Sequence, residues 1–167
     1  MRLAAVLCTM IDQKKFECLA QLAVQWVRTQ EEFIFRHGVP LTEGQIRDAL
    51  QCGVNNPSRI RILVVDRIPL PDDEELTAAG RRAQIITEAS RAVTVGHGIF
   101  IRADCWHDRE LLLHQLVHVA QCERSGGVEP YIGEYLCDRR TCSDFSLGSF
   151  EDEARGMARE ICAADKR

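Results

Sequence analysis

Two histidines four residues apart, His114 and His118, are the side chains of this chain best spaced to act together. On an α-helix this spacing places both side chains on one face, about one turn apart. Two imidazole nitrogens in that arrangement can bind one tetrahedral zinc ion at about 2.0–2.1 Å. A shared ion would also satisfy two imidazoles on a buried helix, where each unsatisfied polar group costs about 1–3 kcal/mol. The alternative is a pair of core histidines bonded to the backbone or to each other.

Gln115 follows the first histidine, at the position where zinc hydrolases with a His-Glu-x-x-His motif carry glutamate. That glutamate takes a proton from metal-bound water and later passes it to the leaving group. A glutamine has nearly the same size and can hold water by a hydrogen bond. Its amide has no accessible pKa, however, so it cannot act as a general base. The sequence therefore predicts a site that binds metal and hydrolyses poorly, whether Gln115 is natural or was introduced.

A third protein ligand is expected from a helix over about residues 149–164, which begins with Glu151 and Glu153. Its apolar stripe consists of Ala154, Met157, Ala158 and Ile161. At roughly 100° per residue, Glu151 lies closer to the centre of that stripe than Glu153 does. We therefore expect Glu151 to be the ligand, with Glu153 as the fallback. The alternative for both is an ordinary acidic first turn, which the helix dipole favours.

These two segments resemble the motifs of the gluzincin clan of zinc metallopeptidases, in particular its small single-domain members, the minigluzincins. The family carries His-Glu-x-x-His on one helix and a glutamate in a Glu-x-Glu-Ala or Glu-x-x-Ala-Asp context on a later one. The matching segments here are HQLVHVAQ at residues 114–121 and EDEAR at residues 151–155. The resemblance covers about residues 93–163. Arg155 departs from it, because the family commonly has an aspartate there that orients a ligand histidine.

The resemblance implies a zincin-like fold with Zn²⁺ held by His114, His118 and Glu151, and position 115 as the base. The implied reaction is hydrolysis of a peptide bond by metal-activated water, on a peptide or protein substrate. The alternative function is a non-catalytic, metal-stabilised module that binds a peptide or a protein. A third possibility is a metal-free structural domain.

Substrate contacts are also implied by the resemblance. The segment containing Gly98, Ile99 and Phe100 resembles the edge strand on which such enzymes hold extended substrates by β-augmentation. Tyr135, and Tyr131 before it, could donate a hydrogen bond to a tetrahedral oxyanion. The alternative for both tyrosines is half-buried packing with a solvated hydroxyl.

The surrounding pattern predicts a single α+β domain over residues 1–167. It would consist of an N-terminal helical part (1–57) and a zincin-like core (58–167) in which helices pack on a small mixed sheet. Strand-forming residues lie at 60–65 and, as a hairpin or bulged strand, around Gly96-His97-Gly98. Helical periodicity lies at 10–36, after Thr42, from Asp72 to about Arg91, from Asp108 to Glu123, and at 149–164.

The composition of the chain limits the kinds of binding partner that we expect. The net charge is −4, aromatic residues make up 6% of the chain, and no basic stripe is present, so we expect no nucleic-acid partner. No stretch approaches the roughly 20 apolar residues of a membrane span, so no membrane partner is expected. The eight cysteines include no Cys-x-x-Cys pair, which favours reduced packing residues and a cytoplasmic protein.

Overall fold

The structure, a computed structural model, describes residues 2–141 and 148–164 of the chain. Within these residues, six α-helices pack on one four-stranded sheet, which confirms the expected mixed α+β class. The helices are α1 (Arg2–His37), α2 (Glu43–Gln51), α3 (Glu74–Arg82), α4 (Arg109–Arg124), α5 (Val128–Thr141) and α6 (Ser149–Ala164). The strands are β1 (Val39–Pro40), β2 (Arg61–Val65), β3 (Ala92–Val95) and β4 (Gly98–Arg102).

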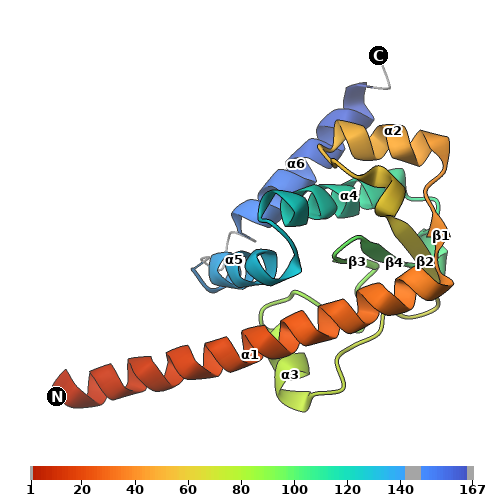
Figure 1. The fold of residues 1–167 in the computed structure, drawn as a ribbon. Coiled ribbons are helices and arrows are strands. Elements are labelled where there is room, and N and C mark those ends of the chain that lie inside the picture. Colours follow the sequence, from red (N-terminus) through yellow and green to blue (C-terminus); the bar gives the residue numbers. More distant parts are fainter. Residues whose placement is uncertain (1, 142–147, 165–167) are drawn as a thin grey trace.

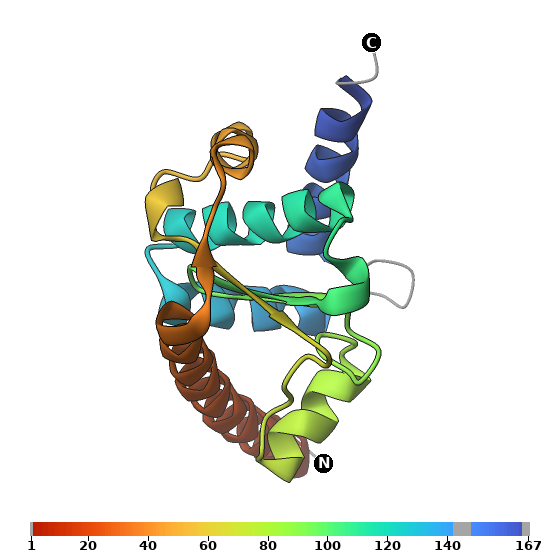
Figure 2. The ribbon, with the colours of Figure 1, turned by 90° about the vertical axis from the view of Figure 1, so that its right-hand side faces the viewer.

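The sheet has the strand order β1-β2-β4-β3. β2 and β4 run parallel, whereas β1 and β3 pair antiparallel to their neighbours. Figures 1 and 2 show α4, α6 and α2 on one side of the sheet and the long helix α1 with α3 on the other. Both faces of the sheet are therefore covered by helices.

Strand β4 lies in the interior of this arrangement. Ile99 and Ile101 pack with α4 in one core cluster, whereas Phe100 packs with Ile34 of α1 in a second cluster. All three side chains are at most 1% exposed. The expectation that residues 98–101 form an edge strand is wrong, because β2 and β3 pair with β4 on both sides. A strand that is apolar on both faces is typical of the interior of a sheet.

Local capping signals set the starts of two helices as predicted. Thr42 and Gln45 form a capping box at the start of α2, and the Asp108 carboxylate accepts a hydrogen bond from the Leu111 N–H at the start of α4. The helix expected to start at Asp72 is instead capped by Asp73, whose side chain accepts a hydrogen bond from the Leu76 N–H. α3 also ends at Arg82, well before the expected Arg91.

The β3–β4 hairpin is held by a partly buried cluster of ionisable groups from three elements. The backbone N–H of His97 donates to Glu31 of α1 at 2.7 Å, and its Nε2 lies 2.9 Å from Oε1 of Glu123 on α4. Glu123 also accepts from the backbone N–H groups of Asn55 and Asn56, at 2.6 and 3.2 Å. This cluster ties α1 and the loop before β2 to the end of α4.

The cluster shifts the pKa of each member. The hydrogen bond with Glu31 raises the pKa of His97, against the opposing effect of burial. Burial alone would raise the pKa values of Glu31 and Glu123, but hydrogen bonds outweigh it and lower both. For Glu31 these bonds come from His97, and for Glu123 mainly from Asn55.

His97→Gln is expected to cost about 1.5–3 kcal/mol of unfolding free energy, the value of a hydrogen bond to a charged group. The His97 contribution is complete below its ordinary pKa of 6.5 and is lost as pH rises through the raised folded pKa. The glutamate contributions are present above 4.5 and are lost as pH falls through the lowered folded pKa values. The unfolding free energy lost in His97→Gln should therefore be largest between about pH 4.5 and the raised pKa of folded His97.

Urea unfolding of the wild type and the variant at about pH 5.5 and about pH 8.5, with a chelator present, measures this difference. His107→Gln is the matched control, because His107 is exposed. An equal loss at both pH values would contradict the assignment of a charged His97.

Candidate metal centre

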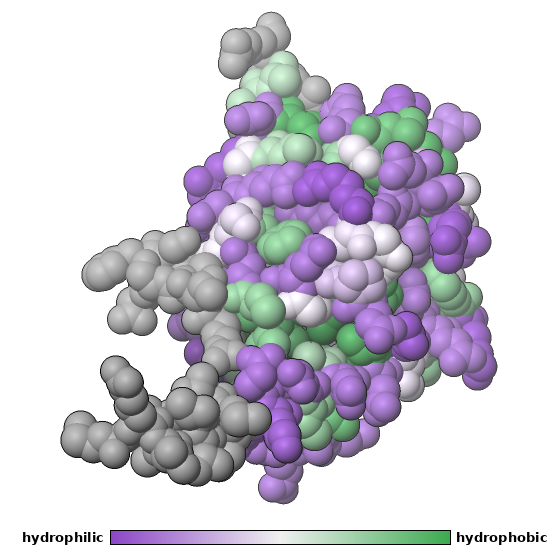
Figure 3. Space-filling view, turned by 60° about the vertical axis from the view of Figure 1, so that its left-hand side comes forward, coloured by the Kyte–Doolittle hydropathy of each residue, from purple (hydrophilic) through white to green (hydrophobic). Residues whose placement is uncertain are grey.

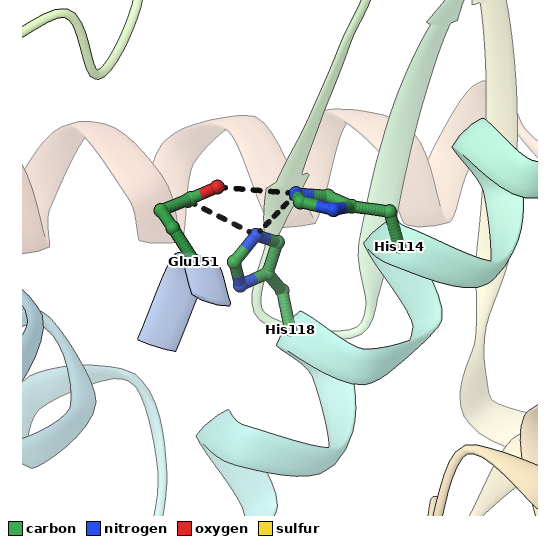
Figure 4. A group of neighbouring side chains, drawn as sticks. All are labelled: His114, His118 and Glu151. Atoms are coloured by element: carbon green, nitrogen blue, oxygen red, sulfur yellow. Dashed lines mark hydrogen bonds and ion pairs between the residues drawn. The ribbon is translucent and has the colours of Figure 1, made fainter. Parts of the chain in front are cut away.

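Three side chains from two helices converge on one point (Figure 4). Nε2 of His114 and Nε2 of His118, both on α4, lie 3.0 Å apart. Oε2 of Glu151 lies 3.2 Å from the first of these nitrogens and its Oε1 lies 3.2 Å from the second. One ligand atom from each residue lies within 4.8 Å of the other two, so the group could hold a metal ion.

The spacing suits a small tetrahedral ion. Ligand atoms about 2.0–2.1 Å from a tetrahedral zinc lie roughly 3.3–3.4 Å from one another. The two histidine nitrogens are 3.0 Å apart, and each lies 3.2 Å from a different oxygen of Glu151, so each of these separations is within a few tenths of an ångström of that value. With one ligand atom from each residue, the three atoms lie within 4.8 Å of one another.

The packing of α4 against α6 brings Glu151 to the histidines. Ala154 and Ala158 of α6 are 0 and 1% exposed and belong to the same core cluster as Leu113 and Leu116 of α4. Such small side chains allow the helix axes to approach closely. Glu151, on the inward side of α6, then reaches the histidine pair.

Glu153, the fallback ligand, lies elsewhere. Its carboxylate accepts hydrogen bonds from Gln121 and Arg124, at 2.8 and 2.7 Å. The structure therefore brings Glu151, and not Glu153, to His114 and His118.

The electrostatic setting favours an ionised Glu151. Burial alone would raise the pKa of this carboxyl group. Hydrogen bonds with His114, His118 and Tyr135 outweigh burial and hold the pKa well below its usual range. The Tyr135 hydroxyl donates to Oε1 of Glu151 at 2.6 Å. Burial, with the negative charge of Glu151, raises the pKa of Tyr135 well above its usual value, so the hydroxyl stays a donor.

Two contacts around His118 were not predicted from the sequence. Oε1 of Gln121 and the hydroxyl of Tyr131 lie 2.8 and 3.2 Å from its Nδ1. Tyr131 comes from α5, a helix absent from the sequence prediction. Gln121 is three residues after His118, and this spacing on one helix face was the available signal.

Gln115 is 5% exposed and connects α4 to strand β3. The Thr94 hydroxyl lies 2.9 Å from its side-chain Oε1 and 3.0 Å from its backbone oxygen. Among the described residues, β3 pairs only with β4, so its other side is an edge of the sheet. The side chain that follows the first histidine is thus tied to the edge strand.

A cleft of about 530 Å³ opens beside the cluster and is bordered by His114, Gln115, His118 and Glu151. Its other walls are largely apolar and come from α1, α3, α5 and β3. Figure 3 shows hydrophobic residues exposed between hydrophilic ones on the face that carries α5 and part of α1. The N-terminal helix therefore forms one wall of the cleft.

The predicted substrate residues Gly98, Ile99 and Phe100 do not border this cleft. They are buried in the inner strand β4, whereas Ala92, Val93 and Thr94 of β3 line the cleft. Residues 98–100 therefore offer no open strand edge to an extended substrate, because β4 lies one strand further inside the sheet than an edge strand would.

The six cysteines whose side chains the structure describes form no disulfide bond with one another and belong to no metal-binding cluster. Burial raises the pKa of Cys52 and of Cys122 to about 12, which leaves both as neutral thiols at physiological pH.

Comparison with known proteins gives no match to a family model, a curated protein or a solved structure. Within the described residues, no helix combines the length and the apolar character needed to cross a membrane. The side chains of the site are therefore the guide to function.

Proposed function

We propose that this chain is a zinc-binding protein with a site of the metallopeptidase type in a zincin-like fold. His114, His118 and Glu151 hold the ion, and Gln115 occupies the position of the general base. The observation that carries this proposal is the convergence of both Nε2 atoms and the Glu151 carboxylate on one point. Two histidines with one glutamate, facing a cleft, match the donor set of catalytic zinc sites that keep a fourth position open.

When bound, zinc would polarise a substrate carbonyl and lower the pKa of a coordinated water. The protein side chains then determine the rate of hydrolysis. Gln115 can orient a water molecule but cannot remove its proton. Tyr135 donates to Glu151, which supports positioning of that carboxylate rather than an oxyanion contact. We therefore infer a site that binds peptide and hydrolyses it slowly.

The substrate would be a peptide or a protein. The free edge of β3 borders the cleft next to Gln115, so an extended peptide could add to it as a further strand. The apolar walls would receive its side chains. The bond between Thr94 and Gln115 favours the second candidate, a non-catalytic peptide-binding module, because it holds the amide in a fixed position at the edge strand.

The proposal is tested by measuring the zinc content of the purified wild type and of the variants Glu151→Gln and Glu160→Gln. We expect about one zinc per chain in the wild type. Glu151→Gln should weaken zinc binding by more than about 100-fold, since even partners outside the ligand set contribute about 10–100-fold. Glu160→Gln, a change at an exposed glutamate of the same helix, is the matched control and should retain zinc. A wild type that binds no added zinc, or equal losses in both variants, would overturn the assignment.

A further inference from the structure

Gln121 is completely buried (0% exposed) and bonds to both helices of the metal centre. Its Oε1 lies 2.8 Å from Nδ1 of His118, one turn earlier on α4. Its Nε2 donates to the backbone oxygen of Phe150 at 2.9 Å and to the carboxylate of Glu153 at 2.8 Å, both on α6. Phe150 directly precedes Glu151. One side chain therefore touches a histidine of the cluster and the turn that carries its glutamate.

The contacts on α6 fix which way the amide points. A backbone carbonyl and a carboxylate are acceptors only, so both must face the NH₂ group of Gln121. Arg124 donates to the same oxygen of Glu153 at 2.7 Å, which keeps this carboxylate ionised and in place. Turning the amide over would place its oxygen against two acceptors. Oε1 must therefore face His118.

The amide orientation in turn fixes the tautomer of His118. A carbonyl oxygen only accepts hydrogen bonds, so Nδ1 of His118 must carry the proton. A hydrogen bond from Nε2 to Glu151 then forms only when the ring carries both protons. In the neutral ring, Nε2 keeps its lone pair, and this nitrogen faces His114 and Glu151. Only a nitrogen with a free lone pair can bind a metal ion. Tyr131 does not fix the tautomer alone, because a hydroxyl can either donate to or accept from Nδ1.

We propose that Gln121 is the positioning residue of the metal centre. It sets the tautomer and ring orientation of His118 and holds the first turn of α6, and hence Glu151, against α4. The role it plays towards zinc rests on the proposed function, whereas its control of the His118 tautomer does not. It takes the part that the resemblance to gluzincins gives to an aspartate, in whose place this chain has Arg155.

The first test measures the tautomer in metal-free protein. Nitrogen-15 NMR of the imidazole side chains, in alkaline solution and with a chelator, shows which ring nitrogen carries the proton. The wild type should show His118 protonated at Nδ1 alone. Gln121→Met, which has a similar shape but no amide, should show a mixture of tautomers. A wild-type His118 protonated at Nε2 would overturn the proposal, and this measurement decides even if Gln121→Met does not fold.

The second test measures zinc affinity by competition with a chelator. Gln121→Met should bind zinc about 10–100-fold more weakly than the wild type, the usual effect of losing a partner of a ligand histidine. Thr77→Val is the matched control, since it removes a buried hydrogen bond, to the Pro71 oxygen at 2.6 Å, on a different helix. Unchanged affinity in Gln121→Met, or an equal loss in Thr77→Val, would overturn the role towards zinc.

The two tests separate this inference from the proposed function. If the wild type binds no zinc, the proposed zinc-binding function is ruled out. Protonation of its His118 at Nδ1, with a mixture in Gln121→Met, would still support control of the tautomer by Gln121.

Discussion

Gln115→Glu is expected to raise the rate of peptide hydrolysis by about 10²–10⁴-fold, the usual contribution of a positioned general acid–base group. The change replaces an amide by a carboxylate of nearly the same size, so the packing of a residue that is 5% exposed is preserved. The Thr94 hydroxyl, which now lies 2.9 Å from Oε1, can donate to the new carboxylate and hold it at the cleft. The measurement is the rate of cleavage of an unstructured protein with zinc added.

Two further variants show whether the gain comes from the metal centre. Gln115→Met keeps the size of the side chain without a base and should remain as slow as the wild type. Gln115→Glu combined with His118→Ala should lose the gain, because the carboxylate then has no metal-activated water to deprotonate. If Gln115→Glu binds zinc and keeps its fold but gains no activity, the site is not of the peptidase type.

His118→Ala is expected to abolish the stabilisation of the fold by zinc. A ligand that binds only the folded state stabilises it by about 4 kcal/mol at a thousand times its Kd. For a domain of this size, each kcal/mol corresponds to roughly 2–4 °C in Tm. Added zinc should therefore raise the Tm of the wild type by about 10 °C and leave that of His118→Ala unchanged.

The matched control for this experiment is His107→Ala. His107 is exposed and lies outside the cluster, so the variant should respond to zinc as the wild type does. Thermal unfolding of the three proteins, with zinc and with a chelator, measures the effect. Persistent stabilisation of His118→Ala would show that zinc binds elsewhere. No shift in the wild type would favour a metal-free structural domain in which the two histidines pair with each other.

Local sequence patterns were sufficient to predict those parts of the site that lie within a single helix. The four-residue spacing of His114 and His118 needs only helix geometry to bring the imidazoles together. Likewise, the apolar stripe of α6 fixes which side of the helix is buried, and Glu151 lies on that side. The Asp108 carboxylate sets the start of α4 by accepting a hydrogen bond from the N–H of Leu111, three residues later in the chain. Periodicity and capping are local properties, so the sequence displays them directly.

Contacts between distant segments were not accessible in this way. The apolar run Ile99-Phe100-Ile101 predicts a strand, but its place inside the sheet depends on pairing with β2, whose residues lie more than thirty positions earlier. Helix α5 was missed, although Tyr131 and Tyr135 have helical spacing. In the fold, α5 packs against α1, and Arg28 of α1 forms a surface ion pair with Glu129 of α5, 101 residues away.

The sequence by itself determined the chemistry available to this protein: two imidazoles on one helix face, an inward-facing carboxylate, and an amide directly after the first imidazole. Only the tertiary structure decided that contacts with α6 turn the oxygen of the Gln121 amide towards His118. It also decided that β3, rather than β4, borders the cleft. The physical reason is that side-chain direction follows from the period of one helix. Strand order and the partner of a buried amide depend instead on which distant segments pack together.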